Sequence, residues 1–160
     1  ASLDAGAASP DGCGDFLWPL ETEIAWFDAD TSEKSASGVS LAALPSDKAI
    51  TLALEPMPEV KLAAKPTSTP KTDDDKKFGG FVIIEKFPAP GHYQVAISGS
   101  GWLDVVQNGA TLESTAHTGS PKCDRLRKSV RFEIGEGPVS IQVSGSPSDS
   151  IKIAVRPATD

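Results

Sequence analysis

The chain has 160 residues, of which 39% are hydrophobic, and its 22 acidic and 15 basic residues give a net charge of −7. A chain of this length corresponds to one domain and buries roughly 70% of its unfolded surface. The acidic balance excludes the basic footprint that nucleic-acid binding needs, and it opposes binding to an anionic membrane surface. No apolar run approaches the length of about 18 residues that a membrane-spanning helix needs. We therefore expect a single domain over residues 1–160, with no nucleic-acid partner and no membrane span.

Residues 1–12 are small and polar, which predicts a flexible N-terminus without a charged and then apolar leader. An exported chain with this start would be the mature form, with its signal peptide removed. The only cysteines, Cys13 and Cys123, both lie in polar sequence contexts that contain or border glycine and proline. Such loop cysteines indicate a disulfide and an oxidising compartment, which is periplasmic or extracellular. Two unrelated free thiols are the alternative.

One helix is expected near the N-terminus. Apolar residues from Leu17 to Phe27 recur at steps of three and four, which predicts a helix over residues 19–29. Pro19 suits the first helical turn. A strand over residues 22–27 is the alternative, because Ile24 and Trp26 also alternate with polar neighbours.

The rest of the first half contains two expected strands and two expected loops. Residues 30–48 are rich in Ser, Ala and Gly and predict a loop, whereas apolar alternation from Ile50 to Leu54 predicts a strand. A short edge strand is expected at Val60–Leu62, next to prolines. Residues 65–77 are charged and contain proline, and they predict an exposed loop.

The second half alternates between apolar and polar residues in short segments separated by turns. Strands are expected at residues 81–84, 93–97, 102–107, 110–113, 130–134, 139–143 and 151–155, with Asn108-Gly109 as a hairpin turn and residues 114–127 as a long polar loop. Eight or nine such strands predict an all-β fold. We expect a two-layer antiparallel β-sandwich, jelly-roll or immunoglobulin-like, with one short N-terminal helix and one disulfide.

Several segments resemble a family of small exported bacterial β-sandwich proteins of uncharacterised function. The segments are Phe78-Gly79-Gly80-Phe81, Pro90-Gly91-His92-Tyr93-Gln94-Val95, Trp102-Leu103-Asp104-Val105-Val106-Gln107-Asn108-Gly109 and the run from Cys123 through Arg127-Lys128-Ser129-Val130-Arg131-Phe132. Cys13 and the pair Trp26-Phe27 also fit. The resemblance spans most of the chain and implies a sandwich fold and export. Members of that family sometimes carry the label homogentisate 1,2-dioxygenase.

The residues of this chain argue against an iron oxygenase. Such a site needs two histidines and a carboxylate on one face of the metal. The chain has only His92 and His117, so both would have to be ligands and no histidine would remain for acid–base chemistry. The label is therefore not adopted as an expectation.

The polar segment 114–128 is the first candidate binding site. It holds His117, Lys122, Arg125 and Arg127, with Arg131 just beyond, and arginines suit carboxylate or phosphate recognition. The functional interpretation is an anion-binding patch. The alternative, which we favour, is that these bases pair with the acidic first half of the chain.

Trp102 is the second candidate. Leu103 and Val105 define the expected core face of its strand, so Trp102 points to the other face and could offer a platform for a sugar or peptide. The alternative is that it fills a covered face together with Val106.

Catalytic and metal sites have little support in the sequence. Ser120, His117 and Asp124 lie close in sequence but without a nucleophile elbow. The aspartates at 28 and 30 and at 73–75 lack the ligand spacing of a calcium loop. We expect no cofactor, no metal and no catalytic residue.

The leading functional prediction is a non-catalytic exported binding module for a protein, a peptide or a cell-envelope polymer. A small-ligand or carbohydrate binder that uses an aromatic platform around Trp102 is the first alternative. A hydrolase or metal-dependent enzyme that uses His117 is the second.

Overall fold

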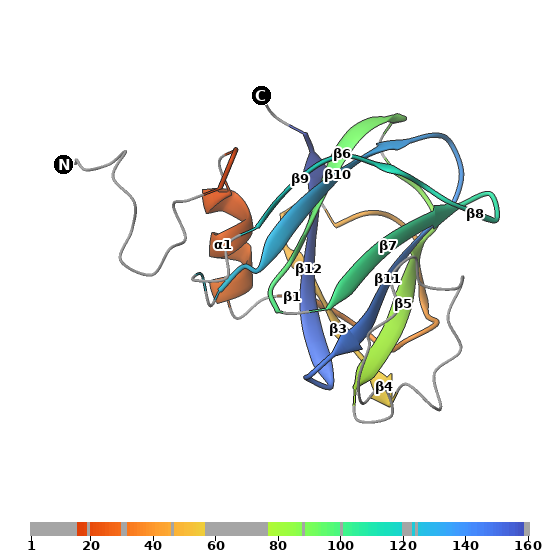
Figure 1. The fold of residues 1–160 in the computed structure, drawn as a ribbon. Coiled ribbons are helices and arrows are strands. Elements are labelled where there is room, and N and C mark those ends of the chain that lie inside the picture. Colours follow the sequence, from red (N-terminus) through yellow and green to blue (C-terminus); the bar gives the residue numbers. More distant parts are fainter. Residues whose placement is uncertain are drawn as a thin grey trace.

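The computed structural model describes residues 16–18, 20–29, 32–45, 47–56, 77–87, 89–99, 101–119, 123 and 125–158. These residues form two β-sheets that face one another, with one short helix on the outside of the first sheet (Figure 1). The all-β class predicted from the sequence is consistent with this arrangement.

The first sheet has the strand order β1-β3-β12-β6-β10-β9. Its strands are β1 (Ser32–Ser35), β3 (Ala49–Ala53), β6 (Gly91–Ile97), β9 (Ser114–Gly119), β10 (Lys128–Ile134) and β12 (Ser150–Pro157). All neighbours in this sheet are antiparallel except β1 and β3, which are parallel.

The second sheet has the strand order β2-β5-β11-β7-β8, with β4 paired to β5. Its strands are β2 (Ser40–Leu41), β4 (Glu55–Pro56), β5 (Phe78–Ile84), β7 (Trp102–Gln107), β8 (Ala110–Thr111) and β11 (Val139–Ser146). Asn108 and Gly109 join β7 to β8 with φ angles of 56° and 78°, which confirms the predicted two-residue hairpin turn.

The core lies between the two sheets and follows from the alternation in the sequence. Every second side chain of each long strand points inward, so that branched aliphatic residues from both sheets meet. Fully buried members include Ile50, Ile97, Ile141 and Ile153. Burial of side chains of this size contributes about 1.5–3 kcal/mol each, which explains why the alternating segments fold as strands.

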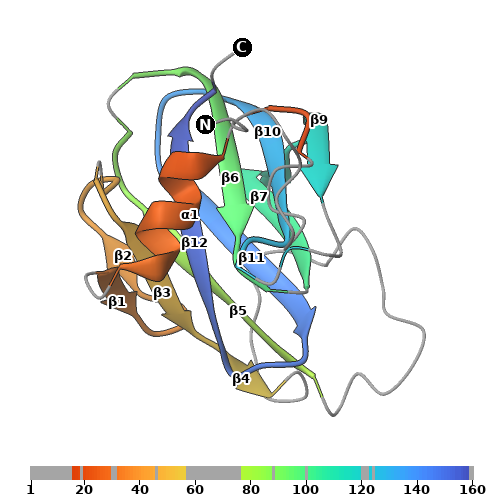
Figure 2. The ribbon, with the colours of Figure 1, turned by 90° about the vertical axis from the view of Figure 1, so that its left-hand side faces the viewer.

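The helix α1 (Glu21–Asp28) confirms the helix predicted over residues 19–29, and the alternative strand over 22–27 is wrong. It packs on the outer face of the first sheet, where Figure 2 shows it in front of β12. Ile24 and Phe27 meet the small side chains of Ala49, Ala96 and Ala154 there. These alanines let the helix approach the strands closely and bury its apolar side chains on the outer face of the first sheet.

The predicted fold class needs two corrections. The sheets are not purely antiparallel, because β2 runs parallel to β5 just as β1 runs parallel to β3. The second correction concerns the predicted disulfide, since none joins two described residues. Cys13 lies outside the described residues. Cys123 is buried in the cluster under α1 and is not a free thiol, so its polar sequence neighbours did not reveal its environment.

Two predicted loops contain strands. The loop expected over residues 30–48 holds the short parallel strands β1 and β2, and the loop expected over 114–127 begins with β9. All three are polar edge strands, which carry no apolar alternation that the sequence could show. The predictions for residues 1–12, for the strand at 60–62 and for residues 65–76 lie outside the described residues.

Candidate functional site

A groove lies at the side of the sandwich where the chain crosses from the second sheet to the first. The strand β8 pairs only with the end of β7, at Val106 and Gln107, so it does not reach the beginning of β7. From β8 the chain passes through Leu112 and Glu113 into β9, the edge strand of the first sheet. The opening that remains between the two sheets has a volume of about 670 Å³. We call it the Trp102 groove.

The Trp102 groove has an apolar floor and a polar rim. The floor is formed by Leu103, Leu112, Val130 and Phe132, which belong to or pack against the core between the sheets. Polar and charged side chains border it: Asp104, Thr111, Glu113, Ser114, His117 and Lys128. Its volume lies within the range of small-molecule sites, roughly 300–1,000 Å³, and such sites combine apolar walls with a few polar groups.

Trp102 stands at the beginning of β7, and its position is set by its neighbours. A Cβ atom on Gly101 would lie 2.9 Å from Val143 Cγ1, so only glycine allows this close approach, and its φ of 156° also favours glycine. Leu103 is buried in the core, which directs Trp102 the other way. As predicted, the Trp102 side chain is exposed, at 40%. Large hydrophobic residues with this exposure are few among the described residues.

Lys128, at the beginning of β10, faces the ring of Trp102. Its Nζ lies 4.8 Å from the ring centroid, within the range of a cation–π interaction. Burial lowers the pKa of Lys128, the positive charge of Arg127 lowers it further, and the carboxylate of Asp104 opposes both effects. The ammonium is therefore a half-buried cation in a groove that also holds an aromatic ring.

His117 lies in β9, opposite Val130 of β10, and both side chains contribute to the groove. The structure thus brings two residues of the predicted ligand sites, Trp102 and His117, to the same place. His92 lies elsewhere: its Nε2 is 2.5 Å from Thr115 Oγ1. The two histidines that an iron site would have to share are engaged at different positions.

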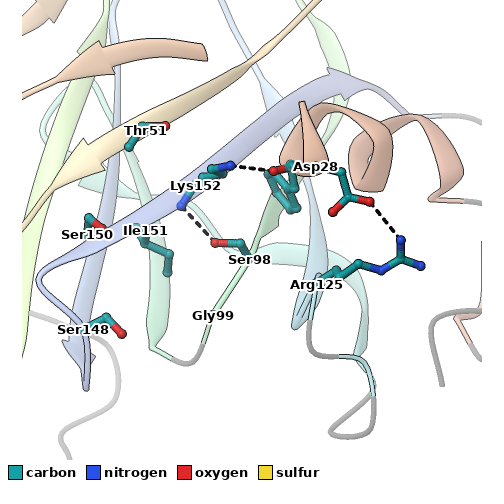
Figure 3. Close-up of a pocket in the computed structure, with 10 residues that line it drawn as sticks. Asp28, Thr51, Ser98, Gly99, Arg125, Ser148, Ser150, Ile151 and Lys152 are labelled. Carbon is teal, nitrogen blue, oxygen red and sulfur yellow. Dashed lines mark hydrogen bonds and ion pairs between the residues drawn. The ribbon is translucent and has the colours of Figure 1, made fainter. Parts of the chain in front are cut away.

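Arg125 lies in a second, smaller hollow of about 420 Å³ at the end of α1 (Figure 3). Its Nη1 is 2.8 Å from Asp28 Oδ2. Next to it, Lys152 Nζ donates to the carbonyl oxygen of Phe27 over 2.5 Å, and the backbone N–H of Lys152 donates to Ser98 Oγ over 3.0 Å. The charged groups of this hollow are paired within the fold and hold the helix end on the sheet.

Arg131 lies on the opposite face of the first sheet from the groove. It is buried beneath the N-terminal segment, with its guanidinium 3.9 Å from the ring centroid of Trp18. Its Nη2 donates to Gln94 Oε1 over 3.2 Å. Arg127 is half-buried, and its backbone N–H donates to the carbonyl oxygen of Ile97. Lys122 lies outside the described residues. The basic residues of the predicted anion patch therefore do not converge on one surface among the described residues.

Sequence reasoning did not select Lys128 and Asp104 as site residues. A signal for Lys128 existed, because it precedes Val130 and Phe132 by two and four positions and so shares their face of the strand. Asp104 shares the face of Trp102 by the same alternation, but its place in the groove also depends on β8 ending before it reaches this part of β7.

The described part of the chain holds neither a cluster of metal ligands nor a membrane-spanning helix. No three His, Cys, Asp or Glu side chains gather there in a way that could hold a metal ion. Its helix is too short to cross a membrane.

A comparison of the chain with known protein families, with curated proteins and with solved structures finds no match. The resemblance to small exported bacterial proteins therefore stays a prediction.

Proposed function

We propose that this protein is a carbohydrate-binding domain that holds a glycan of a cell envelope or of secreted material in the Trp102 groove. The observation that carries the proposal is Trp102 itself, a large aromatic side chain that remains 40% exposed at the edge of an apolar hollow. Burying an exposed aromatic side chain of this size on binding yields a large hydrophobic gain.

The composition of the groove favours a sugar over a purely apolar ligand. A sugar ring has an apolar face of C–H groups and an equatorial belt of hydroxyl groups. The apolar face suits the indole ring and the Leu112 and Val130 side chains, whereas the hydroxyls suit the polar rim at Glu113 and His117. A few placed polar groups around an apolar surface provide orientation and specificity together.

A protein or peptide partner, the other part of the leading sequence prediction, has less support. That prediction depended on a convergent patch of Arg125, Arg127 and Arg131. Arg125 pairs with Asp28, and Arg131 is buried against Trp18 and Gln94. Of the partners that the sequence predicted, we therefore propose the cell-envelope polymer, with the groove as its binding site.

Export also remains part of the proposal, since the groove suits a glycan found outside the cytoplasm. Cell fractionation with an antibody against the chain tests this part independently. A cytoplasmic protein would remove the envelope glycan as the partner without removing the groove.

The first prediction concerns Trp102→Ala. Against a panel of soluble envelope and extracellular polysaccharides, the wild-type protein should retard on at least one polymer in affinity electrophoresis, and the variant should lose this retardation. Calorimetry with the retained polymer should show at least a tenfold weaker affinity, because hot-spot aromatic residues contribute about 2 kcal/mol or more.

Val39→Ala is the matched control, because Val39 is another exposed hydrophobic residue at 42% and lies outside the groove. It should bind like the wild type. If Trp102→Ala keeps the thermal stability and also the full affinity, the groove is not the binding site.

A further inference from the structure

Several buried or half-buried cations donate to an acceptor among the described residues, whereas Lys128 does not. Arg131 donates to Gln94, Arg156 donates to Glu23, and Lys152 donates to the Phe27 carbonyl. No described residue accepts a hydrogen bond from the Lys128 ammonium or forms an ion pair with it, and its contact is the face of the Trp102 ring. A Lys side chain carries three N–H donors. The Lys128 ammonium, which carries these three donors, belongs to a side chain that lines the groove.

A half-buried ammonium without an acceptor is costly, because its hydration is reduced and nothing replaces it. The lowered pKa of Lys128 reflects the same loss of hydration. The charged or titratable groups around the groove are Asp104 from β7, Glu113 before β9, His117 from β9 and the adjacent Arg127. Asp104 attracts the ammonium electrostatically.

We propose that the Trp102 groove binds an acidic sugar, whose ring stacks on Trp102 and whose carboxylate accepts hydrogen bonds from Lys128 Nζ. A uronic acid residue of an acidic polysaccharide has this chemistry. The inference rests on the proposed function and adds the class of ligand. A carboxylate offers two acceptor oxygens, and charge-assisted hydrogen bonds are roughly twice as strong as neutral ones. A neutral sugar of the same shape cannot form these charge-assisted hydrogen bonds. The free-energy cost of the half-buried Lys128 ammonium would therefore remain in its complex.

The test uses pairs of oligosaccharides that differ in one group. Oligomers of galacturonate and of glucuronate are each compared with their carboxyl-reduced counterparts, which keep the ring and lose the charge. The wild-type protein should bind the acidic member of a pair about 10- to 100-fold more tightly by calorimetry, the range expected for a hydrogen bond to a charged group.

Variants of Lys128 separate its role from that of the platform. Lys128→Met should bind both members equally weakly, Lys128→Arg should keep the preference for the acid, and Trp102→Ala should lose both members. Lys34→Met is the control, because Lys34 is an exposed lysine on β1, at the opposite edge of the same sheet. It should behave like the wild type.

Binding should also shift the titration of Lys128. The acidic sugar binds the ammonium form, so it must raise the pKa of Lys128, and its affinity must fall as the pH rises through the pKa of the free protein. NMR of the Lys128 Cε signal, with and without the galacturonate oligomer, follows this directly. An unchanged titration in the presence of saturating oligomer contradicts the inference.

The outcomes distinguish the two proposals. Equal binding of acidic and reduced oligomers, unaffected by Lys128→Met, overturns the acidic sugar but leaves a carbohydrate-binding groove. No binding of any oligomer to a folded wild-type protein, together with no retardation by the polysaccharide panel, overturns both.

Discussion

At the scale of single residues, a network of buried polar side chains lies beneath α1, away from the groove. Glu23 is fully buried and contacts two partners: its Oε2 accepts from Gln94 Nε2 over 2.5 Å, and its Oε1 accepts from Arg156 Nη1 over 3.0 Å. Gln94 in turn accepts from Arg131. A buried carboxylate with these partners fixes the position of the helix on the sheet, because an alternative docking would leave charges unpaired.

Glu23→Ala should therefore destabilise the fold by about 2–3 kcal/mol, because it leaves the Arg156 guanidinium and the Gln94 amide without their acceptor. This estimate is below the cost for a wholly buried pair, since Arg156 remains partly exposed and water can replace part of the loss. Urea unfolding measures the effect. Glu21→Ala, which removes an exposed acid of the first helical turn, should cost less than 1 kcal/mol.

Lys128 should make stability depend on pH at the alkaline end. Its pKa in the folded protein is lowered, mainly by burial, below the value of about 10.4 in an unfolded chain. Between these two values the unfolded state binds more protons, so the free energy of unfolding rises with pH. Below the folded pKa, both states are protonated and the folded state carries the full cost of the buried charge.

The measurement is the difference in unfolding free energy between the wild type and Lys128→Met across pH 7 to 10.5. The wild type should gain stability relative to the variant as the pH rises through this window. A flat difference, or one of opposite sign, would contradict the lowered pKa of Lys128 in the folded protein.

At the scale of elements, α1 depends on the small side chains of the strands beneath it. Ala49, Ala96 and Ala154 come from three adjacent strands and lie with no exposed surface under the helix. The sheet can therefore bury both of its faces.

Ala96→Leu should lift α1 from the sheet and cost about 1–3 kcal/mol, the range for overpacking a tight interface. Near-ultraviolet circular dichroism and the unfolding free energy measure the change. Ala53→Leu is the control, because Ala53 is exposed on β3, and its stability should match that of the wild type. Equal stability of both variants would mean that the helix is not closely packed.

At the scale of the whole molecule, the alternating segments of the sequence were sufficient to predict the long strands and the sandwich. Seven of the predicted segments became β3, β5, β6, β7, β10, β11 and β12, and the helical spacing from Leu20 to Phe27 became α1. Edge strands were missed, because β1, β2 and β9 are polar and their residues follow no apolar pattern. Parallel pairing was missed as well, since it depends on chain crossings that a local pattern does not encode.

The candidate site was predicted only in part, because a local sequence pattern shows some of its features and not others. The side of β7 to which Trp102 points follows from strand alternation, which is local, whereas its exposure does not, because Asp104 and Val106 on the same side are buried. The fate of Arg131 depends on a helix that covers the outer face of its strand, and the importance of Lys128 depends on where β8 ends. Both are consequences of tertiary packing, so the sequence grouped Arg131 with His117 although they lie on opposite faces of one sheet.

The position of β12 has a consequence for biosynthesis. This last strand lies between β3 and β6 in the first sheet, so it joins strands formed by the first third of the chain to those formed by the middle. While the ribosome is still adding residues before Ser150, β3 and β6 have no partner between them. The first sheet can close only when Pro157 has been synthesised, and until then two unpaired inner edges stay open to chaperones and to other nascent chains.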